Sequence, residues 1–61
     1  MTEHEIYLEH LTKASQCAAM LAYDLKAARK STQDPEAMVN LRYWIGTAEA
    51  MRVFLEEMVK V

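Results

Sequence analysis

Only one segment of this 61-residue chain carries the residues of a turn, and it divides the sequence into two parts of similar length. The segment reads "KSTQDPEA", residues 30–37, and holds the only proline, while the only glycine lies elsewhere, at Gly46. Asp34 is suited to cap a helix that starts at Pro35, because a proline at the first helical position gives up no hydrogen bond. The sequence therefore predicts two long elements joined at one point.

The composition of both parts is typical of helices, with many Ala, Leu, Met, Glu and Lys residues. We expect a single domain over residues 1–61, with a first helix over 3–30, a turn over 31–34 and a second helix over 35–60. Because the connection is so short, the helices should lie side by side in opposite directions. The predicted fold class is all-α, a two-helix antiparallel hairpin.

Apolar residues recur along both predicted helices in alternating steps of three and four, which is the spacing of a heptad seam. This seam predicts that Trp44 and Met51 lie in the core, with large side chains facing small ones at several levels. The single cysteine, Cys17, is expected to be a small buried residue in a protein from a reducing compartment. The predicted seam consists of Tyr7, Leu11, Ala14, Ala18, Leu21, Leu25 and Ala28 in the first helix and of Ala37, Leu41, Trp44, Ala48, Met51, Leu55 and Met58 in the second.

The apolar surface is wider than one seam. Chains of this size bury only about 60% of the surface that they expose when unfolded, and a two-helix hairpin has no third layer to cover flanking residues. We expect the remedy to be a second copy, which gives a homodimeric four-helix bundle. The alternative is a different protein that takes the same surface. The residues assigned to self-association are Leu8, Met38, Ile45, Phe54 and Val59.

No pattern in the sequence indicates catalysis, a cofactor or a metal site. His4 and His10 do not share a helical face, and neither has a glutamate three positions earlier, as carboxylate-bridged metal sites in helix bundles do. Cys17 has no histidine one helical turn away, and the only glycine lies inside a helix rather than in a phosphate-binding loop. We therefore expect no enzymatic activity, no cofactor and no bound metal.

A binding surface is expected on the outer side of the second helix. Gly46 costs about 1 kcal/mol relative to alanine inside a helix, so it is either tolerated at the surface or marks a close approach of another molecule. Tyr43 and Val53 lie on the same side, with Arg42 nearby. Exposed apolar groups beside arginines are typical of partner surfaces. We predict that Arg42, Tyr43, Gly46 and Val53 bind another protein.

The charge pattern narrows the classes of partner. A net charge of −2 gives no general attraction to nucleic acid or to an anionic membrane. The N-terminal "MTEHEIYLEH" is acidic where a signal peptide would be basic, and the longest uncharged run, residues 14–23, has about half the length of a membrane span. We expect a cytoplasmic protein without membrane contact. A four-helix dimer that binds RNA stays an alternative, although no basic row runs along either helix.

The segments "MTEHEIYLEHL", "AAMLAYDLKAARK" and "DPEAMVNLRYWIGTAEAMR" give the chain a resemblance to the small helical proteins encoded in the early (exo–xis) region of lambdoid bacteriophages. The resemblance implies an accessory protein without enzymatic activity that binds and modulates a host protein in the bacterial cytoplasm. Its effect would be on host physiology or on the choice between lysis and lysogeny. No residue acquires a role from this resemblance.

The helix start at Asp34 and Pro35, followed by Arg42, is also similar to the hairpin of phage proteins that sequester cyclic-nucleotide immune signals. That likeness implies a further alternative, in which the chain removes such a signal from solution. The sequence shows no ring of additional basic and small residues for the phosphates. This alternative therefore ranks after the two macromolecular partners.

Overall fold

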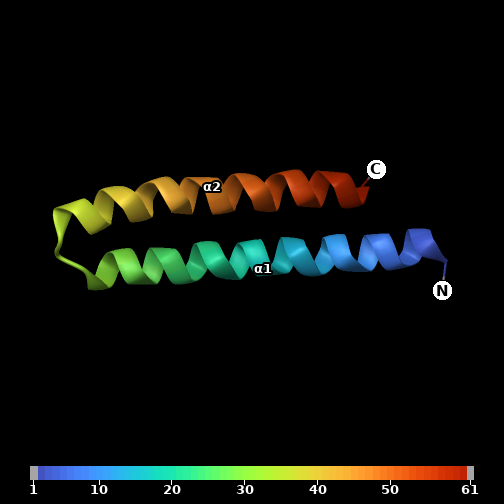
Figure 1. The fold of residues 1–61 in the computed structure, drawn as a ribbon, viewed down its shortest axis with the longest axis horizontal. Helices are drawn as coiled ribbons and strands as arrows, with labels where there is room; N and C mark the ends of the chain where they lie inside the picture. The colour runs from blue at the N-terminus through green and yellow to red at the C-terminus, as the bar shows by residue number, and fades with distance from the viewer. Residues whose placement is uncertain (1, 61) are drawn as a thin grey trace.

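The computed structural model describes residues 2–60, which form two α-helices joined by a short connection (Figure 1). Helix α1 runs over Glu3–Ser31 and α2 over Pro35–Lys60. The helices lie side by side and antiparallel in a single layer, with Cα extents of 48 × 16 × 12 Å. The predicted all-α hairpin is confirmed, and α1 is one residue longer than expected. Neither helix in the described part of the chain has an apolar stretch long enough to cross a bilayer.

Side-chain hydrogen bonds fix where the two helices begin. The carboxylate Oδ1 of Asp34 accepts a hydrogen bond from the backbone N–H of Glu36 at 3.1 Å, as the sequence predicts. The hydroxyl Oγ1 of Thr2 accepts one from the N–H of Glu5 at 3.2 Å. Both contacts satisfy N–H groups that have no partner within the first helical turn. The Thr2 cap is additional to the predictions, and its signal in the sequence is the Thr-x-x-Glu spacing.

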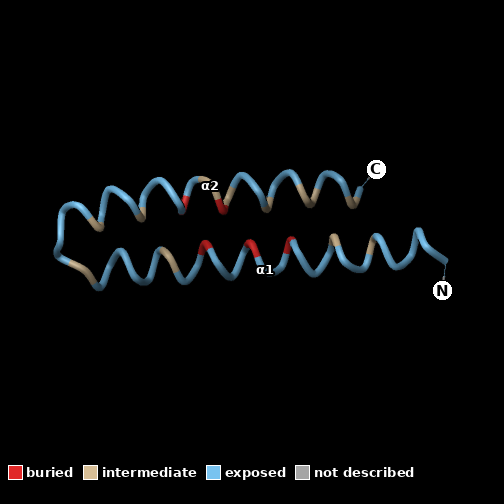
Figure 2. Tube along the Cα trace, in the orientation of Figure 1, coloured by how far each residue is buried: buried red, intermediate tan, exposed pale blue. Residues whose placement is uncertain are grey.

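Small side chains dominate the buried contact between the helices. Ala18, Ala22 and Ala48 are buried, together with Ile45 and the hydroxyl-bearing Ser15 (Figure 2). Small residues on facing sides allow the two backbones to approach closely, and no large side chain in residues 2–60 is fully buried. Half-buried residues extend this contact toward both ends of the hairpin, namely Leu8, Leu11, Leu25, Leu41, Leu55 and Val59.

The predicted heptad register is wrong at every second position except Ala37, which is half-buried. In the structure the seam passes through positions 8, 11, 15, 18, 22 and 25 of α1 and through 41, 45, 48, 52, 55 and 59 of α2. Leu21, Trp44 and Met51, which were expected in the core, are 48%, 55% and 48% exposed. Tyr7 and Met58 are displaced from the core in the same way.

Helix separation explains why the shifted register is adopted. A tryptophan or methionine between the helices would hold their axes apart and would separate Ala18 from Ala48. With Ser15 and Ala22 on the inner side of α1, the helices come close enough to bury Ala48 almost completely, at 1% exposure. The cost is that Arg52 takes a half-buried seam position, where its guanidinium Nη1 bonds to Glu56 Oε1 at 3.0 Å.

The shifted register also changes the burial expected for the residues that the sequence assigns to self-association and for Cys17. Ile45 is buried between the helices of one hairpin, which leaves little of it for self-association, and Leu8 and Val59 are half-buried there. Met38 and Phe54 remain exposed, at 42% and 68%. Cys17 is exposed rather than buried, because it lies on the side of α1 away from the seam.

Replacing Ala22 by leucine should lower the free energy of unfolding by about 1–3 kcal/mol, because the added methyl groups have no space between the helices. The matched control is Ala27→Leu, at an exposed position of the same helix, which should change stability by less than about 0.5 kcal/mol. Urea unfolding followed by circular dichroism measures both variants. Equal stability of the two would contradict the structure, because position 22 lies outside the seam in the register through Leu21.

Candidate interaction surfaces

The shifted register gives the hairpin one broad apolar side. Residues spaced by seven stay in one row along a helix of a two-helix seam, and one such row on each helix borders the same side of the hairpin. The α1 row alternates large and small residues, and the α2 row has one small residue at its turn end. We call the two rows together the apolar face, which consists of Tyr7, Ala14, Leu21, Ala28, Ala37, Trp44, Met51 and Met58.

Hollows in the molecular surface show that the two rows adjoin. Leu21 of α1 and both Trp44 and Met51 of α2 line one hollow of about 300 Å³. Tyr7 of α1 and Met58 of α2 line another of about 410 Å³ at the open end of the hairpin. The apolar face is therefore continuous across both helices at two separate levels.

Leaving this face in water carries a large energetic cost. The large members of the face are between 47% and 55% exposed. Full burial of such a side chain is worth about 1.5–3 kcal/mol, so half-exposure of all of them forfeits several kcal/mol. That amount is comparable to the whole stability of a small domain, which is about 5–15 kcal/mol. A continuous exposed surface of this kind is typical of a contact with another macromolecule.

The opposite side of the hairpin is polar. Lys26 Nζ of α1 lies 2.5 Å from Glu49 Oε1 of α2, and this is the only ion pair between the helices within residues 2–60. The hydrogen bond from Lys26 and its positive charge lower the pKa of the Glu49 carboxyl below its ordinary value of 4.5. Because both side chains are about half exposed, the pair adds little stability. The pair does show that the side of the hairpin opposite the apolar face carries charged residues, which are stable in contact with water.

The predicted partner-binding residues lie together on one strip of α2. Arg42, Tyr43, Gly46 and Val53 are all exposed, and their spacing of three, four and seven puts them on one side of the helix. Tyr43 is 66% and Val53 45% exposed. A Cβ atom added at Gly46 would have no heavy atom within 4 Å, so packing within the hairpin does not require glycine there. We call these four residues the outer strip.

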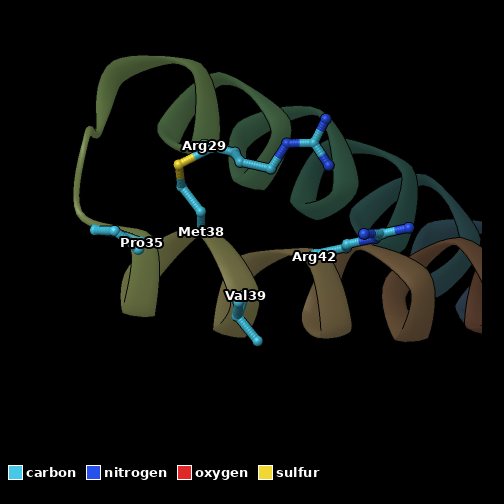
Figure 3. Close-up of a pocket in the computed structure, with 5 residues that line it drawn as sticks. All are labelled: Arg29, Pro35, Met38, Val39 and Arg42. Carbon is cyan, nitrogen blue, oxygen red and sulfur yellow. The ribbon is translucent and has the colours of Figure 1, made fainter.

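An open hollow of about 540 Å³ lies at the turn end of the hairpin (Figure 3). Arg29 of α1 and Arg42 of α2 line it, together with Pro35, Met38 and Val39. Figure 3 shows the two arginine side chains extending from neighbouring helices. Neither guanidinium forms an ion pair with a carboxylate of residues 2–60. We call this site the turn hollow, and its two free guanidinium groups suit an anionic ligand.

The histidines form no metal site with their described neighbours. The His4 ring stacks on the Tyr7 ring, with 6.2 Å between the centroids. Within residues 2–60, no cluster of three or more His, Cys, Asp or Glu side chains has an arrangement that would hold a metal ion. The surfaces that are left for function are the apolar face, the outer strip and the turn hollow.

Comparison with known protein families, with curated proteins and with solved structures finds no match to this chain. The assignment of a function therefore depends on the surfaces themselves. Sequence periodicity placed the apolar face in the core. The signal against that placement is that small residues, Ser15 and Ala22, directly follow Ala14 and Leu21 of this face in α1. The place of Arg29 in the turn hollow has no signal in the sequence, because it depends on how α1 and α2 lie beside each other at the turn.

Acid should weaken the hairpin by a small amount through the pair of Lys26 and Glu49. A carboxyl whose pKa is lowered on folding contributes stability above its unfolded pKa, and this contribution is lost as the pH falls through the folded value. Thermal unfolding of the wild type should therefore become easier below about pH 4.5, and Glu49→Gln should lack this part of the loss. Glu57→Gln is the control and should keep the wild-type dependence. Parallel curves for wild type and Glu49→Gln would contradict a stabilising pair.

Proposed function

We propose that this chain is a binding module without enzymatic activity, a homodimeric four-helix bundle that captures another protein through the outer strip. The observation that carries the proposal is the joint exposure of Arg42, Tyr43, Gly46 and Val53 on a side of α2 that packs against nothing in the hairpin. Exposed aromatic and arginine side chains at the centre of a surface supply most of the binding energy in protein complexes.

The outer strip has the parts of a small recognition site. The Tyr43 ring meets the Trp44 ring edge-on, with 5.0 Å between the centroids and an angle of 84° between the planes. This contact restricts the Tyr43 side chain before binding, which reduces the entropy lost in a complex. Arg42 supplies planar hydrogen-bond donors, and Gly46 leaves the helix backbone open to close approach. An acidic and apolar helix or loop of the partner fits this combination.

In this proposal the dimer covers the apolar face, whereas the outer strip binds the partner protein. A single layer of two helices exposes the apolar face, and a second hairpin supplies the missing layer of a four-helix bundle. The outer strip shares no residue with the apolar face. Dimerisation therefore leaves the strip free, and each dimer presents two copies of it.

The resemblance to exo–xis proteins of lambdoid phages supports a bacterial protein as the target. A phage accessory protein of this kind would act in the host cytoplasm and change host physiology or the choice between lysis and lysogeny. The RNA-binding alternative has less support, because Lys26 is already paired with Glu49 and the open end of the hairpin is acidic. The acidic residues there are Glu3, Glu5, Glu9, Glu56 and Glu57.

The turn hollow supports a second candidate function, the capture of a cyclic dinucleotide. Its two guanidinium groups come from different helices and would contact phosphates, while Pro35 and Met38 offer apolar contacts to a base. Arg29, Pro35 and Arg42 line the same hollow. This grouping adds to the likeness between the segment from Asp34 to Arg42 and the phage proteins that sequester cyclic-nucleotide signals. One hairpin supplies only two cations to such a ligand, so we rank this function second.

The double variant Arg42→Ala/Tyr43→Ala should lose a co-purified bacterial protein while keeping the helical circular dichroism of the wild type. The matched control is Lys13→Ala/Met20→Ala, which removes one cation and one large exposed side chain from the outer side of α1. A tagged pull-down from nuclease-treated bacterial lysate, followed by mass spectrometry, compares the three proteins. Retention of the same protein by the first variant would exclude the outer strip, and loss of all retained material after nuclease would favour RNA binding.

Titration calorimetry with cyclic dinucleotides tests the second candidate. Arg29 lines the turn hollow but lies outside the outer strip, so Arg29→Ala should abolish nucleotide binding and leave protein capture unchanged. Lys30→Ala is the control for simple loss of positive charge at the same end of the hairpin. Absence of heat with the wild type at high protein concentration would exclude this function.

A further inference from the structure

We infer that two copies of the chain join through the apolar face in opposite sense, so that the turn of each hairpin lies beside the open end of the other. In this arrangement α1 packs on α1 and α2 packs on α2 of the second copy. The inference rests on the homodimer of the proposed function and names its interface and geometry. It replaces the self-association residues that the sequence predicts.

The dimensions of the hairpin suit a second copy as the occupant. A layer 48 Å long and 16 Å wide presents roughly 800 Å² to one side, which is one partner's share of a stable interface. The apolar face follows the hairpin from Tyr7 and Met58 at the open end to Ala28 and Ala37 at the turn. Only an occupant of the same length covers all of it, and a second hairpin has that length by necessity.

The pattern of large and small residues selects the opposite sense. A two-fold axis at the middle of the face passes near Ala18 and Ala48, where the two helices are in closest contact. About this axis, Tyr7 lies over Ala28 of the second copy, and Leu21 lies over Ala14. On the other helix, Met58 lies over Ala37, and Trp44 meets Met51. Large side chains thus face small ones at both ends of the bundle, which fills the interface without overlap.

The same-sense arrangement packs worse. The two surface hollows show that Tyr7 and Met58 share one level and that Leu21 and Trp44 share another. With both turns at one end, Tyr7 would meet Met58 of the second copy and Leu21 would meet Trp44. Ala28 would face Ala37, so that the turn end would contain a void while the open end, where Tyr7 meets Met58, was overfilled. Voids and overpacking each destabilise an interface.

Charge favours the same choice. The turn end carries the cations Lys26, Arg29 and Lys30 beside Arg42, and the open end carries the acidic cluster described above. Opposite sense sets unlike ends side by side, whereas same sense sets like ends together. Next to the α1 row, His10 and Asp24 lie on either side of the two-fold axis, at distances along the helix that differ by one residue. Opposite sense therefore brings His10 of each copy beside Asp24 of the other.

Cys17 provides an internal reporter of the geometry. It is exposed and lies within one residue of the middle of the apolar face on α1. With α1 packed on α1 in opposite directions, the two Cys17 side chains meet at the two-fold axis. Ser31 at the turn end is then roughly 40 Å from its counterpart, at 1.5 Å per helical residue. In the same-sense bundle the two Ser31 residues are less than roughly 20 Å apart, one bundle diagonal.

Sedimentation equilibrium and distance measurement together test the inference. The wild type should sediment as a dimer of two 7.0-kDa chains. Oxidation with diamide should link Cys17 to Cys17 at micromolar concentration. A nitroxide label on Cys17→Ser/Ser31→Cys should then give a distance of roughly 40 Å by pulsed electron resonance. A dimer with a distance under roughly 20 Å overturns the inference and leaves the proposed dimer intact.

A pair of methionine variants tests whether the apolar face is the interface, independently of the relative direction of the two hairpins. Met51→Glu should convert the dimer to monomer at a concentration where the wild type is dimeric, since the carboxylate would be buried against Trp44 of the second copy. Met20→Glu, at a 67% exposed position on the outer side of α1, should stay dimeric. The Trp44 emission of the wild type should shift to longer wavelength on dilution, which needs no variant at all. A dimeric Met51→Glu variant, or an unshifted Trp44 in a dissociating dimer, overturns the interface, and a wild type that is monomeric throughout overturns the dimer as well.

Discussion

Close contact between small side chains determines everything else in this hairpin. Ala18, Ala22 and Ala48, with Ser15 beside them, let two helices approach until Ile45 is the only large residue enclosed between their middles. The gain is a well-defined contact with little empty space. The consequence is a core too small to hold the aromatic and methionine side chains of the chain. Those residues lie outside, and four of them, Tyr7, Trp44, Met51 and Met58, lie on one side.

The arrangement separates three surfaces by their chemistry. The ion pair between the helices occupies the polar side, where Lys26 bridges α1 and α2 through Glu49. The apolar face occupies the opposite side and offers little besides hydrophobic contact and size complementarity. The outer strip of α2 mixes an arginine, a tyrosine and an open glycine, which is the composition of a specific contact rather than of a core. A single chain of 61 residues thereby has separate surfaces for the assembly and for the recognition that we propose.

Much of the fold could be predicted from the sequence because its signals are local. The turn residues around Asp34 and Pro35 and the helix-forming composition lead directly to an antiparallel hairpin. The heptad register could not be predicted in the same way, because two registers share Leu11, Ala18 and Leu25 and differ by one residue between them. Counting apolar residues favours the register through Leu21 and Trp44. Helix separation decides for the other, since the energy of close packing depends on size and not only on polarity.

The candidate surfaces likewise divide into those that local sequence signals predict and those that depend on packing in three dimensions. The outer strip could be predicted, because spacing along one helix is a local property, and the structure brings its members together as expected. The apolar face could not, since it consists of residues that the sequence placed inside. The turn hollow joins Arg29 and Arg42 from different helices, so it depends on how the two helices meet beside the turn in three dimensions. An error in the heptad register thus assigns exposed residues to the core and core residues to the surface, although the hairpin fold itself is predicted correctly.

We propose that one hairpin buries too little apolar surface and depends on a second copy for its stability. The most direct measurement is the thermal midpoint of unfolding by circular dichroism at protein concentrations that span two orders of magnitude. Unfolding coupled to dissociation makes the midpoint rise with concentration, by several degrees over such a range. The account predicts that rise in the wild type. A midpoint that does not change with concentration, in a chain that sediments as a monomer, would contradict it.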